Sequence, residues 1–399
     1  MYMTNENPCP CCSNSDFELI FLFPSIPVSG IFRNNSSCDL KTNSLKFELC
    51  IKCAYVRQNN QELRKDYEKV TRSTELQYPK YINLLIQNLN TLKVNYDDLI
   101  IEIGANDGKY IQALGEYGYR NIIGIEPSEE LASLARETNF KIYNNFFNLD
   151  FAKQFVSIHG KVKAVICRHT LEHIPNVADF IAGIHYCMLE KDAVLLIEVP
   201  DSDAILDYMN VYELWDEHLH YFSAPNLFLL LNKYNLKVLQ LEIYNHLDTR
   251  NLLMWCTTGN NSVESIASNG NLAFKKVNFW RSLKISWNEF KNKIQAKIAS
   301  SKKPIFMIGA SHSQTNFINY LEISSSISYC IDDDPEKIGK IPPTTNNNLK
   351  IISTGDFMHS SNGALLKTGF GYPDWSKNIS DYALKHDFSL IEPDFEKTK

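Results

Sequence analysis

The fold is decided by the stretch Ile101-Glu102-Ile103-Gly104-Ala105-Asn106-Asp107-Gly108. The apolar residues Leu99 and Ile100 precede this stretch, and a helix-like segment from Lys109 to Tyr117 follows it. An apolar run, a glycine turn and a helical pattern, in that order, predict a buried strand, a tight turn and the start of a helix. In an α/β sheet, a ligand of the nucleotide type binds at such a turn.

A second predicted strand ends in an acidic residue. It covers residues 121–127, and Glu126 lies about 20 residues beyond the glycines, where a carboxylate can bind ribose hydroxyls. These features alone would also fit NAD. The third glycine of the dinucleotide fingerprint is absent, however, and the run Cys167-Arg168-His169-Thr170-Leu171-Glu172-His173-Ile174-Pro175 follows the fourth predicted strand. With these residues the chain resembles the class I S-adenosylmethionine-dependent methyltransferases.

The resemblance implies an α/β fold with a doubly wound, Rossmann-like sheet and S-adenosylmethionine as the cofactor. The cofactor site would lie at the carboxyl ends of the first strands of this sheet. His169 is expected to pack near the methionine moiety and not to take part in the chemistry. The residues that we assign to the cofactor are Glu102, Gly104, Asn106, Gly108, Glu126, Arg168 and His169.

The composition favours a globular protein with several cores. The chain has 399 residues, of which 44% are hydrophobic and 22% charged, and this length predicts two or three domains. A net charge of −6 argues against nucleic acid as a partner. Residues 1–7 lack the basic and apolar parts of a signal peptide, and no apolar run approaches the roughly 18 residues of a membrane span. We therefore expect a cytoplasmic protein that acts on a small molecule and does not cross a membrane.

The cysteines are concentrated near the N-terminus, where six of the ten lie in the first 53 residues. Two C-x-x-C pairs, Cys9 with Cys12 and Cys50 with Cys53, have the spacing of a four-thiolate zinc site. Such a site is closed, so we expect a structural zinc that contributes to the folding of a short segment with little core of its own. Cys11 could replace Cys12 as a ligand. The alternative is that the cysteines are incidental thiols.

Periodicity predicts the remaining elements. Helical spacing covers residues 61–92, and strand and helix patterns then alternate as far as about residue 257, which predicts a seven-stranded doubly wound sheet. Residues 271–301 contain no glycine or proline and read as a long helix. A second strand–turn–helix–strand pattern follows, with strands at residues 304–308 and 328–331. The predicted strands of the large sheet are Leu99–Ile103, Asn121–Glu126, Lys141–Tyr143, Ala164–Cys167, Val194–Val199, Leu236–Ile243 and Leu252–Thr257.

This order predicts three domains: a zinc-binding module over residues 1–70, a methyltransferase core over 71–258 and a smaller α/β domain over 259–399 with an accessory or substrate-binding role. A further motif is Leu214-Trp215-Asp216-Glu217-His218-Leu219-His220-Tyr221-Phe222-Ser223. With it, the chain resembles the sugar C-methyltransferases that act on nucleotide-linked 4-keto-6-deoxysugars. The resemblance implies a nucleotide-linked ketosugar that is methylated on carbon.

Methylation of a sugar carbon needs an enolate, which a base forms by removing the proton next to the ketone. His218 is the candidate base, because an imidazole is suited to proton abstraction near neutral pH. Glu217 would orient His218 or bind a sugar hydroxyl, and Tyr67 is a third catalytic candidate that matches the family's tyrosine-rich loop. Trp215 stands where the family tends to carry a tyrosine, and it has no phenol to polarise a ketone. The structural alternative is that Glu217 and His218 are polar residues of a loop.

Three other functions are compatible with the sequence. A small-molecule O- or N-methyltransferase would use the same cofactor and a base that deprotonates a hydroxyl or an amine. A nucleic-acid-modifying protein would use the four-cysteine module as a reader, but residues 1–60 lack clustered basic and aromatic residues. An inactive sugar-binding homologue would keep the binding sites without the activity.

Overall fold

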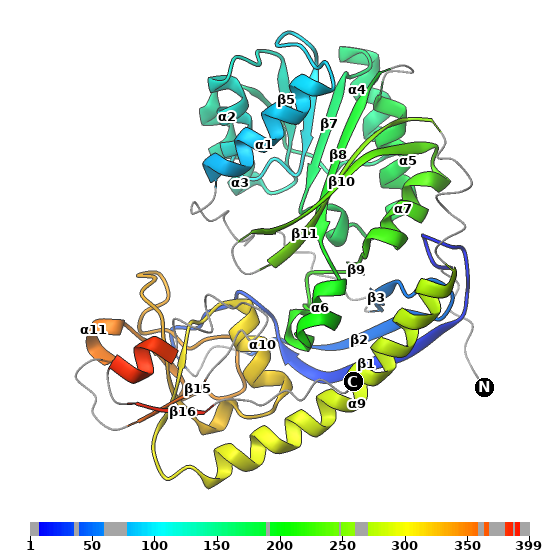
Figure 1. Cartoon of the computed structure of the whole chain (residues 1–399). Coiled ribbons are helices and arrows are strands. Elements are labelled where there is room, and N and C mark those ends of the chain that lie inside the picture. The colour runs from blue at the N-terminus through cyan, green and yellow to red at the C-terminus, as the bar shows by residue number, and fades with distance from the viewer. Residues whose placement is uncertain are drawn as a thin grey trace.

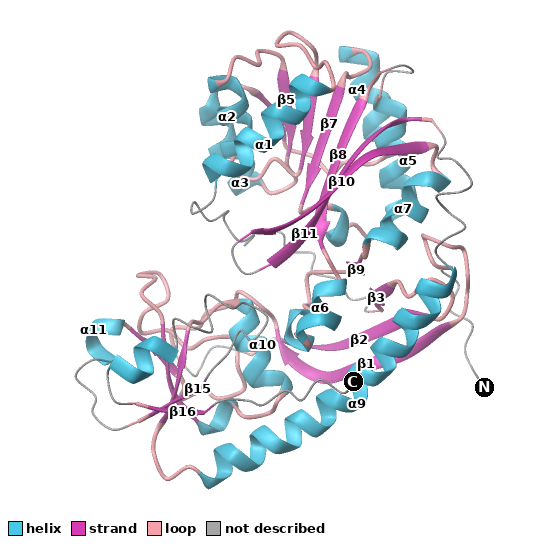
Figure 2. Ribbon diagram, viewed as in Figure 1, coloured by secondary structure: helices cyan, strands magenta, loops and turns pink. Residues whose placement is uncertain are grey.

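The computed structural model contains three β-sheets within the residues that it describes (Figure 1). Figure 2 shows helices on both sides of the largest sheet. Tyr67 and the first part of the helical pattern over residues 61–92 lie outside the described residues. The structure describes residues 8–35, 40–59, 78–188, 192–246, 249–259, 270–357, 363–366, 380–385 and 388–391.

The central sheet has seven strands in the order β10-β11-β8-β7-β4-β5-β6. Strand β11 is antiparallel to both of its neighbours, and the strands from β8 to β6 are parallel. The chain passes from β4 to β5 on one side and returns to β7 on the other, so a ligand crevice is expected at the carboxyl end of β4. The strands are β4 (Ile100–Ile103), β5 (Ile122–Ile125), β6 (Lys141–Tyr143), β7 (Ala164–Arg168), β8 (Val194–Pro200), β10 (Leu236–His246) and β11 (Thr249–Thr258).

Helices cover both faces of this sheet, which explains why its inner strands are apolar on both sides. Helices α1, α2 and α3 lie on one side, and α4, α5 and α7 on the other (Figure 1). The predicted doubly wound α/β fold is confirmed, and each predicted strand overlaps an observed one. These helices are α1 (Tyr78–Thr91), α2 (Lys109–Glu116), α3 (Glu129–Ala135), α4 (Leu149–His159), α5 (Val177–Cys187) and α7 (Ala224–Lys233), and the short elements between them are η2 (Arg136–Thr138), η3 (Leu171–His173), α6 (Asp203–Tyr208) and η4 (Val211–Glu213).

The N-terminal sheet has the order β1-β2-β3-β9 and is antiparallel. Its last strand, β9, comes from the middle of the chain, where His220 pairs with Arg57 and Tyr221 pairs with Val56. The pairing of β9 with β3 therefore joins the motif at residues 214–223 to the segment that contains the four spaced cysteines. The strands are β1 (Phe17–Pro27), β2 (Thr42–Cys50), β3 (Val56–Gln58) and β9 (His220–Tyr221).

The C-terminal sheet has five parallel strands in the order β14-β13-β12-β15-β16. The two strands predicted at residues 304–308 and 328–331 are β12 and β13, which are joined through α10. The predicted second βαβ unit is thus confirmed. The elements are β12 (Ile305–Ile308), α10 (His312–Tyr320), η5 (Ser324–Ser326), β13 (Ile327–Ile331), β14 (Lys350–Ile352), α11 (Thr354–Phe357), β15 (Ala364–Leu366) and β16 (Ser389–Ile391).

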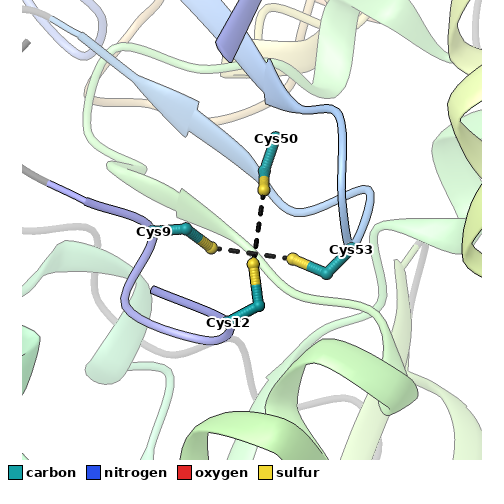
Figure 3. A group of neighbouring side chains, drawn as sticks. All are labelled: Cys9, Cys12, Cys50 and Cys53. Carbon is teal, nitrogen blue, oxygen red and sulfur yellow. Dashed lines mark hydrogen bonds between the residues drawn. The ribbon is translucent and has the colours of Figure 1, made fainter. Parts of the chain in front are cut away.

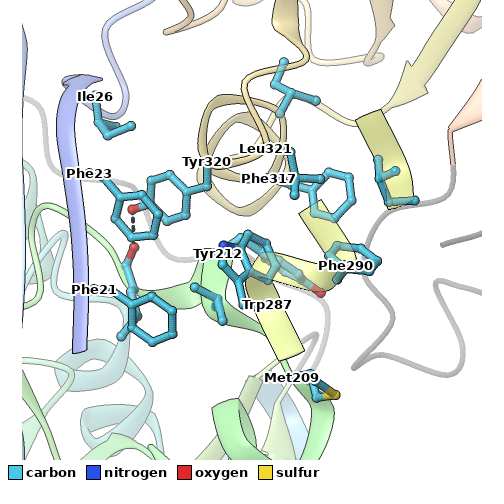
Figure 4. Packing of buried hydrophobic residues seen from close by; sticks show 14 of the residues in the cluster. Phe21, Phe23, Ile26, Met209, Tyr212, Trp287, Phe290, Phe317, Tyr320 and Leu321 are labelled. Atoms are coloured by element: carbon cyan, nitrogen blue, oxygen red, sulfur yellow. Dashed lines mark hydrogen bonds between the residues drawn. The ribbon is translucent and has the colours of Figure 1, made fainter. Parts of the chain in front are cut away.

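Helix α9 (Gly270–Ser300) precedes the C-terminal domain in the chain and packs against β1 and β2 of the N-terminal sheet. Its buried apolar residues recur every three or four positions, and they share one hydrophobic core with β1 and α10. In this core the Phe23 ring stacks on Tyr320, with 3.8 Å between ring centroids, and the Tyr320 hydroxyl donates to the Leu214 carbonyl (Figure 4). The buried apolar residues of α9 are Val277, Trp280, Leu283, Trp287, Phe290, Ile294 and Ile298.

No helix in the described segments is both long enough and apolar enough to span a bilayer.

Candidate functional site

The glycine turn after β4 has a left-handed backbone, with φ of 76° at Gly104 and 79° at Gly108. A Cβ atom on Gly104 would lie 2.1 Å from Thr170 Oγ1, and one on Gly108 would lie 2.9 Å from the Cα of Ala135. Both glycines are therefore required by the conformation and the packing of the protein itself. They allow the turn to close tightly over the carboxyl end of β4.

Glu126, directly after β5, holds this turn in place. Its carboxylate accepts hydrogen bonds from the backbone amides of Asn106 and Ser128, each at 2.9 Å. Burial raises the pKa of Glu126, although these two hydrogen bonds favour the charged form. A carboxylate has more acceptor positions than two amides use, so Glu126 can still bind hydroxyl groups of a ligand.

Arg168, at the end of β7, is enclosed by the protein. Its guanidinium lies over the rings of Tyr110 and Tyr81, at 3.5 and 4.3 Å from their centroids. Its Nε atom lies 2.6 Å from Glu198 Oε2, and Nη1 lies 4.0 Å from Glu102 Oε1. Only 9% of the side chain is exposed. Arg168 is thus engaged with two carboxyl groups of the protein. This arrangement favours a positioning role for Arg168 rather than a direct contact with the cofactor.

The two carboxyl groups beside Arg168 differ in their ionisation. Burial raises the pKa of Glu102 to about 8, and its Oε2 atom is buried without a hydrogen-bond partner. Burial alone would also raise the pKa of Glu198, but the charges of Arg168 and His169 outweigh it and lower that pKa well below its usual range. Glu102 therefore offers an oxygen atom without a hydrogen-bond partner next to the glycine turn, whereas Glu198 is fully engaged.

His169 connects two buried carboxylates. Its Nε2 atom lies 3.1 Å from Glu198 Oε1, and its Nδ1 atom lies 3.5 Å from Glu172 Oε1. Burial lowers the pKa of His169, but the two carboxylates outweigh this effect and raise the pKa to about 10. His169 is therefore a cation at neutral pH, and it also lines the cavity described next.

A cavity of about 140 Å3 lies beyond the end of β8. Asp201, Trp215, His218, Arg250 and His312 are among its lining residues, so the central sheet contributes through Arg250 of β11 and the C-terminal domain through His312 of α10. The His218 ring lies 4.8 Å from the Trp215 ring, and the Trp215 ring stacks on His312 at 4.3 Å. Burial and nearby histidines hold the pKa of His218 well below its usual range. His218 is consequently a neutral imidazole at pH 7.

Of the other two catalytic candidates, Glu217 and Tyr67, only Glu217 lies within the described residues. Glu217 precedes His218, and its backbone carbonyl accepts a hydrogen bond of 2.8 Å from His173 Nδ1. Tyr67 lies outside the described residues.

Sequence reasoning missed Glu198, Glu172 and His312. A charge within the apolar run of β8 was a signal for Glu198, whereas nothing in the sequence connected His312 with residues almost 100 positions earlier.

The four spaced cysteines lie together beside β2 (Figure 3). The Sγ atoms of Cys9 and Cys53 are 3.6 Å apart, those of Cys12 and Cys50 are 3.5 Å apart, and all four lie within 4.8 Å of one another. Tetrahedral zinc with Zn–S bonds of about 2.3 Å places its sulfur ligands roughly 3.8 Å apart. Cys11 is buried but is not a member of this group. The cluster can therefore hold one metal ion with Cys12 as a ligand.

The comparison that decides the type of the central domain covers residues 75–241. These residues include the glycine turn, Glu126 and the His218 loop, and they match the protein family described as "Methyltransferase domain". The chain contains a class I methyltransferase domain. The predicted class I methyltransferase domain is thereby confirmed.

The chain is similar to part of a curated relative, the C-methyltransferase NovU from Streptomyces niveus, with 24% identity over 163 residues. The match covers 41% of this chain and 38% of NovU. Among solved structures, magnesium protoporphyrin IX methyltransferase from Synechocystis with bound SAH has 15% identity and a TM-score of 0.36, and covers 46% of this chain and 84% of that chain. A S-adenosylmethionine-dependent methyltransferase from Clostridium acetobutylicum has 11% identity and a TM-score of 0.38, with coverages of 47% and 94%.

Proposed function

We propose that the protein transfers the methyl group of S-adenosylmethionine to a carbon atom next to a ketone, in a nucleotide-linked 4-keto-deoxysugar. The observation that carries this proposal is the neutral imidazole of His218 in a cavity at the carboxyl edge of the methyltransferase sheet. The 24% identity to a C-methyltransferase supports carbon as the acceptor atom. Residues 259–399 would form an accessory domain for the acceptor, because His312 lines the same cavity.

The residues around the glycine turn fit the proposed cofactor. Glu126 would accept hydrogen bonds from the ribose hydroxyls, since its carboxylate keeps free acceptor positions. Glu102 would bind the amino group of the methionine moiety, which would satisfy its buried Oε2 atom. Gly104, Asn106 and Gly108 would shape the turn against which the nucleoside lies. When bound, the cofactor supplies an electrophilic methyl group on a sulfonium.

The protein must then produce a carbon nucleophile in line with that methyl group. His218 accepts the proton from the carbon next to the ketone, and the resulting enolate carbon forms the new bond. A base whose imidazole is neutral at pH 7 can accept this proton without first losing one. His173 helps to position this loop, because its ring donates to the Glu217 carbonyl one residue before His218. Glu217 would orient His218 or bind a sugar hydroxyl, and Tyr67 stays a catalytic candidate.

We infer a structural zinc ion at Cys9, Cys12, Cys50 and Cys53. The Sγ separations of 3.5 and 3.6 Å support a tetrahedral thiolate site. Thiol–thiol hydrogen bonds and burial raise the pKa of Cys53, so without a cation the four groups do not all ionise. Four protein ligands leave no open coordination position, and such a zinc would stabilise the fold and take no part in the methyl transfer.

The test is solvent exchange at the carbon next to the ketone. The zinc-loaded protein is incubated in deuterium oxide with S-adenosylhomocysteine and each of several nucleotide-linked 4-keto-6-deoxysugars. Deuterium should enter the substrate with the wild type and not with His218→Asn, while both proteins bind S-adenosylmethionine with similar affinity. His185→Asn, on α5, is the matched histidine control. Exchange that persists in His218→Asn, or methylation of an oxygen or nitrogen atom, would reject this mechanism in favour of an O- or N-methyltransferase.

A further inference from the structure

Three side chains of types that commonly bind metals lie close together beside the cavity that His218 lines. They are Glu172 and His173 of η3 and His218 of the loop before β9, and their ligand atoms all lie within 4.8 Å of one another. Within the described residues, this group and the four cysteines are the groups of His, Cys, Asp and Glu that could hold an ion. The two groups differ in chemistry, because one offers sulfur and the other offers imidazole nitrogen and carboxylate oxygen.

Glu172 is the strongest indication of a ligand at this place. The residue is 1% exposed, and neither carboxylate oxygen has a hydrogen-bond partner. Its nearest cation is His169, 3.5 Å away, which is shared with the carboxylate of Glu198. A buried carboxylate without hydrogen bonds is unfavourable unless a cation compensates for it. A metal ion between Glu172 and the two histidines would provide that compensation.

The orientation of His173 also indicates a metal ligand. Its Nδ1 atom lies 2.8 Å from the Glu217 carbonyl oxygen, and because a carbonyl only accepts, Nδ1 must carry the proton. The Nε2 atom then has its lone pair available. Metal-binding histidines are commonly oriented by such a hydrogen bond from the other ring nitrogen to a carbonyl or carboxylate. The His218 ring lies next to this lone pair, with 4.8 Å between the two ring centroids.

We infer that Glu172, His173 and His218 form a second metal site, which takes a divalent transition ion of the Zn2+ or Co2+ type. Two imidazoles and one carboxylate suit these ions better than Mg2+ or Ca2+. In a tetrahedral site the ligand atoms are roughly 3.4 Å apart, so the observed group, whose atoms lie within 4.8 Å of one another, would contract around the bound ion. Three protein ligands leave one coordination position for water or another small ligand.

Metal binding at this site would inhibit the enzyme. This consequence rests on the proposed function, because the ion would occupy the lone pair of His218 that accepts the substrate proton. The ion is therefore a regulator of the methyl transfer and not a participant in it. The metal site itself depends only on the geometry of the three ligands.

The test is a Co2+ titration of the full-length protein with zinc already bound to the cysteine cluster, followed by calorimetry and visible absorption. One further equivalent of Co2+ should bind, with d–d bands and without thiolate charge-transfer bands. Glu172→Gln and His173→Gln should each weaken this binding by at least roughly tenfold. His312→Gln is the matched control, because His312 lines the same cavity but is not in the group of three. Its Co2+ affinity should stay that of the wild type.

Several outcomes would overturn the site: no second equivalent of Co2+, sulfur charge-transfer bands from that equivalent, or an unchanged affinity in the two variants. If one variant does not fold, as judged by its thermal unfolding, the other and His218→Asn still decide the question. The exchange assay separates the two proposals. If Co2+ binds as expected but deuterium exchange continues at saturating Co2+, the metal site stands and His218 is not the base.

Discussion

The backbone amide of Asn106 donates a 2.9 Å hydrogen bond to the carboxylate of Glu126, which joins the turn after the first strand of the central sheet to the end of its neighbour. The C-terminal sheet repeats this relationship, because the amide of Ala310 lies 2.9 Å from Asp332 Oδ2. In that sheet, Lys337 Nζ also lies 3.3 Å from Asp332 Oδ2. The charge of Asp332 in the C-terminal sheet is therefore compensated by Lys337, whereas the carboxylate of Glu126 in the central sheet accepts hydrogen bonds from two backbone amides.

Replacement of Glu126 should weaken S-adenosylmethionine binding. Glu126→Ala removes charge-assisted hydrogen bonds worth about 1.5–3 kcal/mol, which corresponds to roughly 10- to 150-fold in the dissociation constant measured by calorimetry. Glu129→Ala removes a nearby carboxylate whose side chain is 68% exposed, and it should leave the affinity unchanged. Equal affinities for the wild type and Glu126→Ala would move the ribose site to another part of the chain.

Loss of one thiolate should release the metal of the cysteine cluster. Cys50→Ser should lower the zinc content well below one ion per chain and reduce solubility, because metal binding contributes directly to folding in such modules. The measurement is metal analysis of the purified protein. Cys11→Ser is a matched control, since Cys11 is also buried but lies outside the group of four, and it should keep a full zinc content. Zinc retained by Cys50→Ser and lost by Cys11→Ser would reverse the ligand assignment.

The N-terminal sheet should depend on the C-terminal domain for its stability. Phe23 is 8% exposed and stacks on Tyr320, so Phe23→Ala should lower the free energy of unfolding by about 3–5 kcal/mol. Denaturation by urea measures this change. Phe279→Ala removes an α9 ring that is 60% exposed and should have little effect. If the two substitutions had equal effects, the shared core of Figure 4 would not stabilise the protein as we expect.

Much of the fold is predictable because its signals are local. The glycine turn, the alternating apolar segments and the two C-x-x-C pairs each lie within a few residues, and the corresponding strands and cysteine cluster form where they predict. Strand β9 could not be predicted in this way. It has two residues, His220 and Tyr221, and its formation depends on Val56 and Arg57, far away in the sequence. Non-local pairing of so short a segment leaves no periodic pattern.

The charges around the site could be recognised only in part. The acid Glu198 within an apolar strand indicates a buried charge that needs a partner. Its partners, Tyr81, Arg168 and Tyr244, come from α1, β7 and β10, and no spacing rule connects them. The sequence also suggested that Arg168 contacts the cofactor. Whether its charge faces a ligand or the protein depends on side-chain packing, which here encloses Arg168 between two tyrosine rings.

The buried carboxyl of Glu102 should make the protein less stable as the pH rises. Burial raises its pKa in the folded protein to about 8, whereas a glutamate in the unfolded chain has a pKa of about 4.3. Between these values the folded state keeps a proton that the unfolded state has lost, so the free energy of unfolding falls with increasing pH. Glu102→Gln has no such proton. The free energy of unfolding of Glu102→Gln minus that of the wild type should therefore increase as the pH rises between the two pKa values. It should level off at pH values above the folded pKa.

Urea unfolding of the wild type and Glu102→Gln, measured at several pH values from about 5 to about 9, tests this difference. His169 also changes its ionisation on folding, because neighbouring carboxylates raise its pKa to about 10. That effect is common to both proteins and cancels in their difference. Glu129→Gln, an exposed carboxyl on α3, should give a profile parallel to that of the wild type. If Glu102→Gln were also parallel, Glu102 would be ionised in the folded protein, and its pairing with Arg168 would outweigh its burial.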